Sequence, residues 1–271
     1  MTDKQNSNSG LLPALLKYWR NSRGLSQLDL SLAADVSARH ISFLETGRAK
    51  PSQDLLLALA STLQVPMREQ NTLLQAAGFT PLFEEPGPQE VLAGPMGKVI
   101  DFMLSNHDPY PMVIMDWTYN LINLNKSAMH LFAHFPPKEM RAVSEINLFE
   151  AVFDPNQLRD YVVNWEITAH HLLVVLHRLA LLNSHDGRLA ELLDKLLSYP
   201  DVPGAWKQPD FCANKNSTLT VELKNQDLEL SFMTTVTGFN APQNITLEEI
   251  RIESYIPLNE TTDTFFKALP I

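Results

Sequence analysis

Between residues 11 and 77, apolar residues recur at helical spacing and are interrupted at short intervals by turn-forming residues. Nothing in this stretch alternates apolar and polar side chains as a strand does. Ser26 and Ser37 are suited to begin helices, and Gly24 and Gly47 are suited to end them. The pattern predicts an all-α domain of five short helices, over residues 11–22, 26–34, 38–45, 52–63 and 67–77.

From residue 96 onwards, helical and strand patterns both occur. Helices are expected over 96–106, 125–135, 147–153, 155–183 and 188–198, and strands over 112–115, 121–124, 218–223, 228–237 and 247–255. The last strands alternate apolar and polar residues, which is typical of half-buried antiparallel strands. Two strands, several helices and three more strands predict an α+β domain of PAS-like architecture, with one mixed or antiparallel sheet and helices to one side.

Residues 78–97 separate these two regions and contain four prolines and four glycines, which indicates a linker. We therefore expect four segments along the chain. They are a polar N-terminal tail (1–10), the helical domain (11–80), a linker (81–97) and the PAS-like domain (98–271).

The formal net charge of −10 is unevenly distributed along the chain. Residues 1–80 hold eight basic and six acidic residues, whereas residues 81–271 hold 13 and 25. A locally basic face is what contacts with phosphate groups require. The sequence has no apolar run of membrane-spanning length, no signal peptide, and a single cysteine, Cys212. These features predict a cytoplasmic protein that does not contact a membrane.

Only three residues separate the expected helices over 26–34 and 38–45. Such a short link imposes a steep crossing angle, so that one helix braces against the DNA backbone while the next enters the major groove. Arg39, His40 and Ser42 are then expected to face outward near the start of the second of these helices. The alternative is that the small helices form a protein-interaction module.

The segment from Ser26 to Ser52, SQLDLSLAADVSARHISFLETGRAKPS, resembles the helix-turn-helix of the Cro/repressor type, also called the XRE family. It departs from the family pattern at Ser31, where alanine is frequent, and at Asp35, where glycine is frequent. Aspartate tolerates the left-handed backbone conformation better than most residues, so we expect the turn to be kept.

The XRE resemblance implies a role for each residue of the expected DNA surface. Gln27 would contact a phosphate, Arg39, His40 and Phe43 would lie toward the bases, and Arg48 and Lys50 toward the backbone. Phe43 could equally belong to the core. The residues expected at the DNA are Gln27, Ser37, Arg39, His40, Ser42, Phe43, Arg48 and Lys50.

Motifs of the second region are similar to the ligand-binding domain of MmyB-like regulators. They are PMVIMD (111–116), LINLN (121–125), NLF (147–149), FDP (153–155), RDY (159–161) and NWE (164–166). Asn164 stands where the family usually has aspartate. That family joins a Cro-type helix-turn-helix to a PAS-like domain, so the resemblance implies a ligand-responsive regulator.

Large aromatic residues in the second region predict an apolar ligand pocket, although ordinary core packing would also explain them. They are Trp117, Tyr119, Phe132, Phe135, Trp165 and Trp206. For a ligand such as a fatty acid, Arg159 or Arg178 would receive the carboxylate, because both lie beside apolar helix faces. The residues expected at the ligand are Trp117, Tyr119, Phe132, Arg159, Trp165 and Arg178.

The sequence contains no constellation that supports catalysis, so we expect no enzyme, no cofactor and no metal. His130 and His134 have the spacing of metal ligands on one helix face, but no third ligand accompanies them. His170, His171 and His177 are expected to form a polar stripe on the long helix.

Together these patterns predict a sequence-specific DNA-binding transcriptional regulator, acting as a homodimer on a near-palindromic operator in double-stranded DNA. Its second domain would bind a small apolar effector, such as a fatty acid, and modulate DNA affinity. Repression is the more usual mode for this architecture. Two alternatives remain open: a sensor holding flavin or haem, and a second domain used only for protein interaction or dimerisation.

Overall fold

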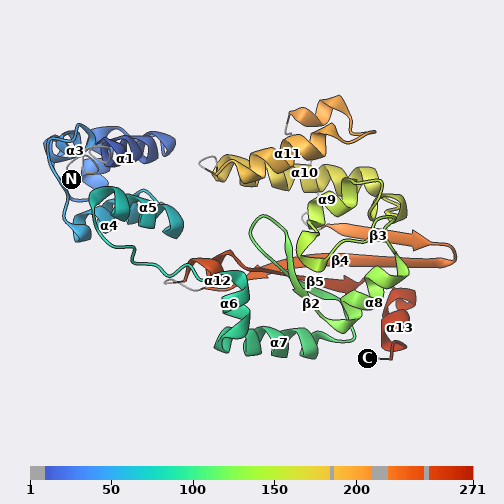
Figure 1. The fold of residues 1–271 in the computed structure, drawn as a ribbon. Coiled ribbons are helices and arrows are strands. Elements are labelled where there is room, and N and C mark those ends of the chain that lie inside the picture. Colours follow the sequence, from blue (N-terminus) through green and yellow to red (C-terminus); the bar gives the residue numbers. More distant parts are fainter. Residues whose placement is uncertain (1–9, 184–185, 209–218, 241–243, 271) are drawn as a thin grey trace, which may run out of the picture. The chain divides into compact units, whose positions relative to one another are not determined.

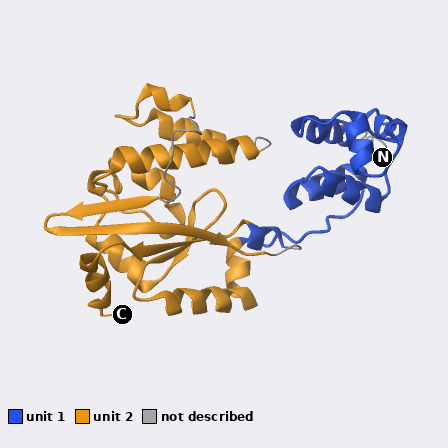
Figure 2. Ribbon diagram, turned by 180° about the vertical axis from the view of Figure 1, so that it is seen from behind, with its two compact units in different colours: residues 1–87, 241–248 blue, residues 88–240, 249–271 orange. Residues whose placement is uncertain are grey.

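The computed structural model describes residues 10–183, 186–208, 219–240 and 244–270. The chain divides into two compact units, residues 1–87 with 241–248 and residues 88–240 with 249–271, which we describe separately (Figure 2). Three expected features fall outside the described residues. They are the N-terminal tail up to residue 9, Cys212, and residue 218 at the start of an expected strand.

The first unit is built from helices whose ends fall within one residue of the expected positions (Figure 1). They are α1 (Leu11–Ser22), α2 (Gln27–Ala33), α3 (Ala38–Glu45), α4 (Gln53–Thr62) and α5 (Met67–Ala77). The agreement has a local cause, because Ser26 forms a capping box with Asp29, and Ser37 and Ser52 cap α3 and α4. The helices enclose a core that includes Trp19, which is 2% exposed.

Left-handed backbone conformations occur at the expected turns of the first unit. Gly24, with a φ of 66°, follows α1, and Gly47, with a φ of 71°, follows α3. Asp35, between α2 and α3, has a φ of 52°. The turn is therefore kept without glycine, as expected for aspartate.

The segment 81–97, expected to be a linker, contains regular structure. Glu84 forms an isolated parallel bridge with Asn244, and the Thr246 hydroxyl donates a hydrogen bond to the carbonyl of Pro86. α6 (Pro88–Ala93) follows. Two of the prolines that suggested a linker instead stand first in helices, where their missing N–H group costs nothing. The division between the two units falls inside this segment, between residues 87 and 88.

The second unit contains a five-stranded sheet with the order β2-β1-β5-β4-β3. The strands are β1 (Met112–Met115), β2 (Leu121–Leu124), β3 (Thr220–Asn225), β4 (Leu228–Gly238) and β5 (Arg251–Pro257). Every neighbouring pair is antiparallel, so the described sheet is not mixed. The expected hairpin after β1 is present, and the Asp116 carboxylate closes it by accepting hydrogen bonds from Thr118 and Asn120.

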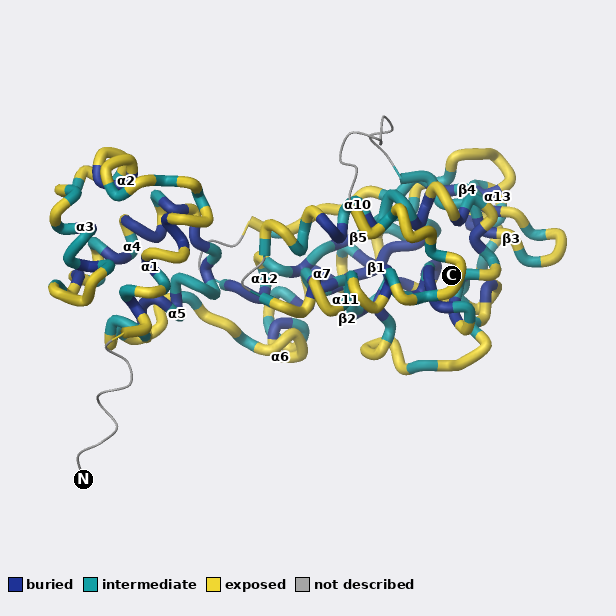
Figure 3. Tube along the Cα trace, turned by 90° about the horizontal axis from the view of Figure 1, so that it is seen from above, coloured by how far each residue is buried: buried dark blue, intermediate teal, exposed yellow. Residues whose placement is uncertain are grey.

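Helices lie on both sides of this sheet, not on one side as expected. They are α7 (Pro95–His107), α8 (Lys126–His134), α9 (Leu148–Phe153), α10 (Trp165–Leu182), α11 (Arg188–Ser198) and α13 (Glu260–Lys267), with short 3-10 turns at Val143–Glu145, Arg159–Tyr161 and Gly204–Lys207. α9, α10 and α11 lie over one face, and α7 lies on the opposite side (Figure 1). Buried residues follow the central strands (Figure 3), and all four residues of β1 are buried.

Two expected elements are corrected by the structure, and one helix is added. The long helix begins at Trp165 and not at residue 155, because the backbone N–H of Val163 instead donates to Glu222 of β3 at 2.8 Å. Residues 247–249, expected in a strand, belong to α12 (Ile245–Glu249), whose start is capped by the Asn244 side chain. α13 was not expected, and the Asn259 side chain caps it.

Candidate DNA-binding surface and ligand cavity

Helix α3 is held in place by its buried face. Ile41 and Leu44 are each 1% exposed and pack in the same core as Leu30 of α2. The first turn of α3 is fixed by Ser37, whose hydroxyl oxygen accepts a hydrogen bond from the backbone N–H of His40 at 3.2 Å. With this face anchored, the opposite face of α3 carries the exposed side chain of Arg39.

Arg39 and Phe43 lie together on α3. The guanidinium carbon of Arg39 is 5.2 Å from the centroid of the Phe43 ring, which is a cation–π contact. Phe43 is partly buried and lies outside the core cluster of the first unit. Its ring therefore supports the arginine. This role lies between the two that the sequence left open, a contact with the bases and packing in the core.

The other residues expected at the DNA are distributed around α3. Arg48 and Lys50 are exposed beyond its C-terminal end, whereas His40 and Ser42 on the helix are partly buried. Gln27 already has a partner within the protein, because its side-chain amide donates to Oε2 of Glu45 at 2.8 Å.

A buried ion pair behind this surface was missed by sequence reasoning. Nε and Nη2 of Arg20 donate to the two carboxylate oxygens of Glu45 at 2.6 and 3.0 Å, and Nη1 donates to the carbonyl of Leu25 at 2.7 Å. The two charged side chains are only 9% and 3% exposed. A signal was present, since Arg20 follows Leu16 by four residues on the buried face of α1.

The electrostatics of this pair favour its charged form. Burial alone would raise the pKa of Glu45, but hydrogen bonds from Arg20 and Gln27 outweigh burial and hold that pKa below its usual value. The hydrogen bond to Glu45 likewise raises the pKa of Arg20. One carboxylate thus joins α1, the start of α2 and the end of α3.

The second unit contains a cavity of about 380 Å³, within the size range of small-molecule pockets. Most of its wall is apolar. The apolar lining residues come from α8, α9, α10 and neighbouring loops and strands: Leu131, Phe132, Leu148, Phe149, Val152, Leu158, Val162, Leu172, Val175, Leu219, Val221, Leu223 and Val236. The cavity therefore lies between the sheet and the helices that cover one of its faces.

Of the six residues expected at the ligand, Tyr119 and Phe132 line the cavity, and the other four are not among its lining residues. Trp165 is buried, and its indole N–H donates to the carbonyl of Val152 at 2.9 Å. The guanidinium carbon of Arg159 lies 3.5 Å from the centroid of the Trp165 ring.

Trp117 and Arg178 are also placed away from the cavity wall. Trp117 lies under the guanidinium of Arg188, 4.8 Å from its ring centroid. Arg178 is exposed on α10. The side chains proposed to hold a carboxylate, Arg159 and Arg178, are therefore not brought together at the cavity.

A polar group on β5 that sequence reasoning missed does line the cavity. Glu253 occupies a polar position of an alternating strand, and such positions usually face solvent, but helices cover that face of the sheet. Burial raises the pKa of Glu253 to about 7. Burial also raises the pKa values of Tyr119 and Tyr255, which line the same cavity.

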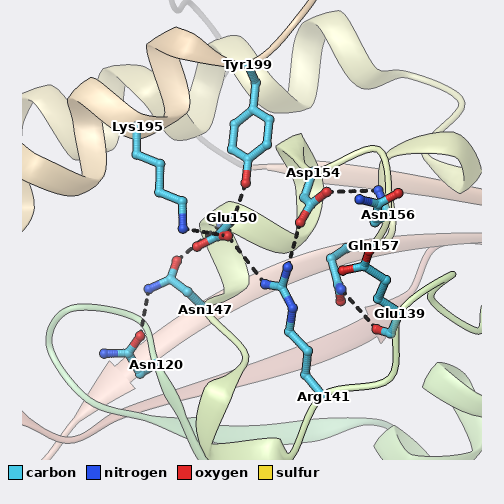
Figure 4. A network of polar contacts seen from close by, with 10 residues as sticks. All are labelled: Asn120, Glu139, Arg141, Asn147, Glu150, Asp154, Asn156, Gln157, Lys195 and Tyr199. Carbon is cyan, nitrogen blue, oxygen red and sulfur yellow. Dashed lines mark hydrogen bonds and ion pairs between the residues drawn. The ribbon is translucent and has the colours of Figure 1, made fainter.

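A second polar cluster holds the loop before α9 against α11 (Figure 4). Oε1 of Glu150 accepts hydrogen bonds from Arg141 at 3.3 Å and from the Tyr199 hydroxyl at 3.0 Å, and Lys195 lies 2.8 Å away. Arg141 also donates to Asp154 at 2.9 Å. Every charged member has a partner of opposite sign, so this cluster is a structural connection.

The histidines of the second unit do not form a metal site in the described part of the chain, where no group of three or more potential ligands occurs. Nδ1 of His134 contacts the carbonyl of His130 at 2.8 Å. His177 is buried and contacts the carbonyl of Trp206, whereas His171 lines the cavity. No helix in the described residues is both long and apolar enough to cross a membrane.

A helix-turn-helix surface in one unit and a ligand-sized cavity in the other define the chain as a ligand-binding transcription regulator. A family model described as MmyB-like transcription regulator ligand binding domain matches residues 97–269, and a helix-turn-helix model matches residues 16–70. The chain belongs to the family of MmyB-like transcription regulators, and its DNA-binding region is of the XRE type. A search of curated proteins found no match.

Proposed function

We propose that this regulator reads an operator through α3 and responds to a small apolar effector bound in the cavity of the second unit. The observation that carries the proposal is the cavity of about 380 Å³, whose lining is mostly apolar. Burial of each methylene group of an acyl chain there contributes about 0.8 kcal/mol. The antiparallel sheet with helices over the cavity supports a PAS-like fold for the effector domain.

The proposed DNA surface comprises Gln27, Ser37, Arg39, His40, Ser42, Phe43, Arg48 and Lys50. Arg39 is the residue we assign to base contacts, because it is exposed and supported by Phe43. Arg48 and Lys50 are assigned to phosphate contacts. The family matches support DNA binding by residues 11–80 and effector binding by residues 98–271, joined by residues 81–97.

We further propose that a homodimer binds a near-palindromic operator, since two helix-turn-helix units then enter successive major grooves. Repression by occlusion is the proposed mode. Light scattering of the purified protein measures the oligomeric state, and footprinting measures the spacing of the half-sites. A monomer that protects a single half-site would overturn this part of the proposal.

The first experiment is selection of bound DNA from random fragments by the full-length protein, without an effector and with long-chain fatty acids or the matching fatty alcohols. We expect one enriched operator whose affinity changes when the effector is present. Arg39→Ala should weaken operator binding by about 1–3 kcal/mol and relax base preference at one position. An unchanged base preference would remove Arg39 from the residues that read the sequence.

The effector site is tested by filling the cavity. Val175 lines the cavity on α10, whereas Ile167 on the same helix is 65% exposed. We expect Val175→Trp to abolish the effector response but keep effector-free DNA affinity, and Ile167→Trp to change neither. A full response in Val175→Trp would show that the effector binds elsewhere.

A further inference from the structure

The described part of the cavity wall carries several polar groups but no fixed positive charge. Its polar lining residues are Tyr119, Thr168, His171, Thr234, Thr235, Glu253 and Tyr255. None of the described lining residues is lysine or arginine. Burial and the neighbouring His170 lower the pKa of His171, which favours its neutral form. Within the described wall, a ligand therefore meets a carboxyl group that has no lysine or arginine beside it among the lining residues.

The nearest arginine along β5, Arg251, does not line the cavity, although its charge acts on Tyr119 in the cavity wall. Nη1 of Arg251 donates a hydrogen bond to the carbonyl of Ile250 at 3.1 Å, and Arg251 is not among the cavity-lining residues. It makes further contacts within the protein. Among the described lining residues, no lysine or arginine therefore matches the charge of Glu253.

Glu253 retains hydrogen-bonding capacity. The Tyr255 hydroxyl donates to its Oε2 at 3.4 Å, and the Thr234 hydroxyl provides a second hydrogen bond. An ionised carboxylate offers about four acceptor positions, so two hydroxyl donors leave about two of them open. A ligand that ends in a donor can occupy one of these positions.

We propose that the cavity selects an amphiphile whose apolar body ends in a hydrogen-bond donor, a hydroxyl or an amine, and that Glu253 accepts this hydrogen bond. The inference rests on the proposed function, because it takes the cavity as the effector site. A donor gains a hydrogen bond in surroundings of low dielectric constant. A carboxylate head group would instead place a second negative charge beside Glu253. The apolar wall accepts the chain of a fatty acid, but the polar groups do not suit its head group.

Four probes with the same chain separate these possibilities: dodecylamine, dodecanol, dodecyl methyl ether and dodecanoate. Calorimetric titration of the full-length protein is carried out at about pH 8, where Glu253 is mostly ionised, with each probe below its solubility limit and each ionic probe below its critical micelle concentration. We expect dodecanol to bind about tenfold more tightly than its methyl ether, which lacks the donor. Dodecylamine should bind at least as tightly as dodecanol, and dodecanoate most weakly.

Two matched variants assign the preference to Glu253. Glu253→Gln removes the charge and adds an amide donor, so it should erase the preference for dodecylamine over dodecanoate. Glu229→Gln makes the same chemical change on the exposed side of β4, where Glu229 pairs with Lys224, and should leave the ranking unchanged. If a variant fails to fold, the ranking of the four probe affinities in the unmodified protein still tests the inference.

The possible results distinguish this inference from the proposed function. Dodecanoate binding as tightly as dodecanol, or a preference for dodecylamine over dodecanoate that survives Glu253→Gln, would overturn the inference and leave an apolar effector site standing. If none of the four probes binds, both the inference and the proposed function fail.

Discussion

Replacement of Glu45 by alanine is expected to destabilise the first unit selectively. The side chains of Arg20 and Glu45 are 9% and 3% exposed and are joined by two hydrogen bonds. Loss of the carboxylate leaves a buried guanidinium whose remaining partner is the carbonyl of Leu25. Removal of one partner from a buried ion pair costs about 3–5 kcal/mol. Because whole domains are stable by only about 5–15 kcal/mol, Glu45→Ala should remove a large part of the stability of this unit.

A double replacement tests whether the loss arises from the unpaired charge. Exchange of both partners for apolar residues of similar size is often neutral or stabilising. We therefore expect Arg20→Met with Glu45→Met to recover most of the stability lost in Glu45→Ala. Glu84→Ala, which removes an exposed glutamate of the same unit, should change the free energy of unfolding by less than about 0.5 kcal/mol.

The assay must distinguish the two units. Tryptophan fluorescence reports the unfolding of both units at once, because Trp19 lies in the first unit and the other three tryptophans lie in the second. Hydrogen–deuterium exchange measured on peptides from 11–77 and from 97–182 in increasing urea separates their transitions. A loss below about 1 kcal/mol in Glu45→Ala, or a double variant as unstable as the single one, would refute the reasoning.

Three further predictions follow from local geometry. Gly97→Ala should lower the midpoint of thermal unfolding of the second unit, because its Cβ would lie 1.7 Å from the carbonyl oxygen of Leu92, whereas Gly94→Ala meets nothing closer than 3.5 Å and should be milder. Asp35→Val should cost about 1–2 kcal/mol in urea unfolding, because a β-branched residue is strained at a φ of 52°. Burial alone would raise the pKa of Glu150, but hydrogen bonds lower it. The contribution of Glu150 to the free energy of unfolding is therefore present above its unfolded pKa of 4.5 and is lost as pH falls through its lower folded pKa. Glu150→Gln should make stability less dependent on pH in this acidic range.

The first unit was predictable because its determinants are local. Ser26 and Ser37 each act within three residues of their own position, and Asp35 fixes a turn through its own backbone preference. The outward direction of Arg39 follows from the helical period once Ile41 is buried. The Arg20–Glu45 pair joins residues 25 positions apart, and helical periodicity alone does not specify such a contact.

The cavity was less predictable because its wall is assembled from distant segments. Tyr119, Phe132 and Glu253 come together only when β5 inserts beside β1 and helices cover the sheet. Aromatic content indicated a pocket, but it did not distinguish a cavity wall from the neighbouring core that contains Trp165. The alternation in β5 was read correctly as a strand, yet alternation does not reveal which face a helix covers.

The backbone crosses between the two units three times: at residues 87–88, again after residue 240, and again after residue 248. Its excursion into the first unit leaves from the end of β4 and returns just before β5, and these are the strands that carry Thr234 and Glu253. Residues 244–246 are hydrogen-bonded to residues 84–86. A fragment ending at residue 87 would therefore lack part of its own unit. Residues 241–248 belong to the DNA-binding unit, and their two ends are covalently joined to the segments that contain β4 and β5. An effector that shifts β4 or β5 would therefore act on the DNA-binding unit through these two connections as well as through the connection after α5.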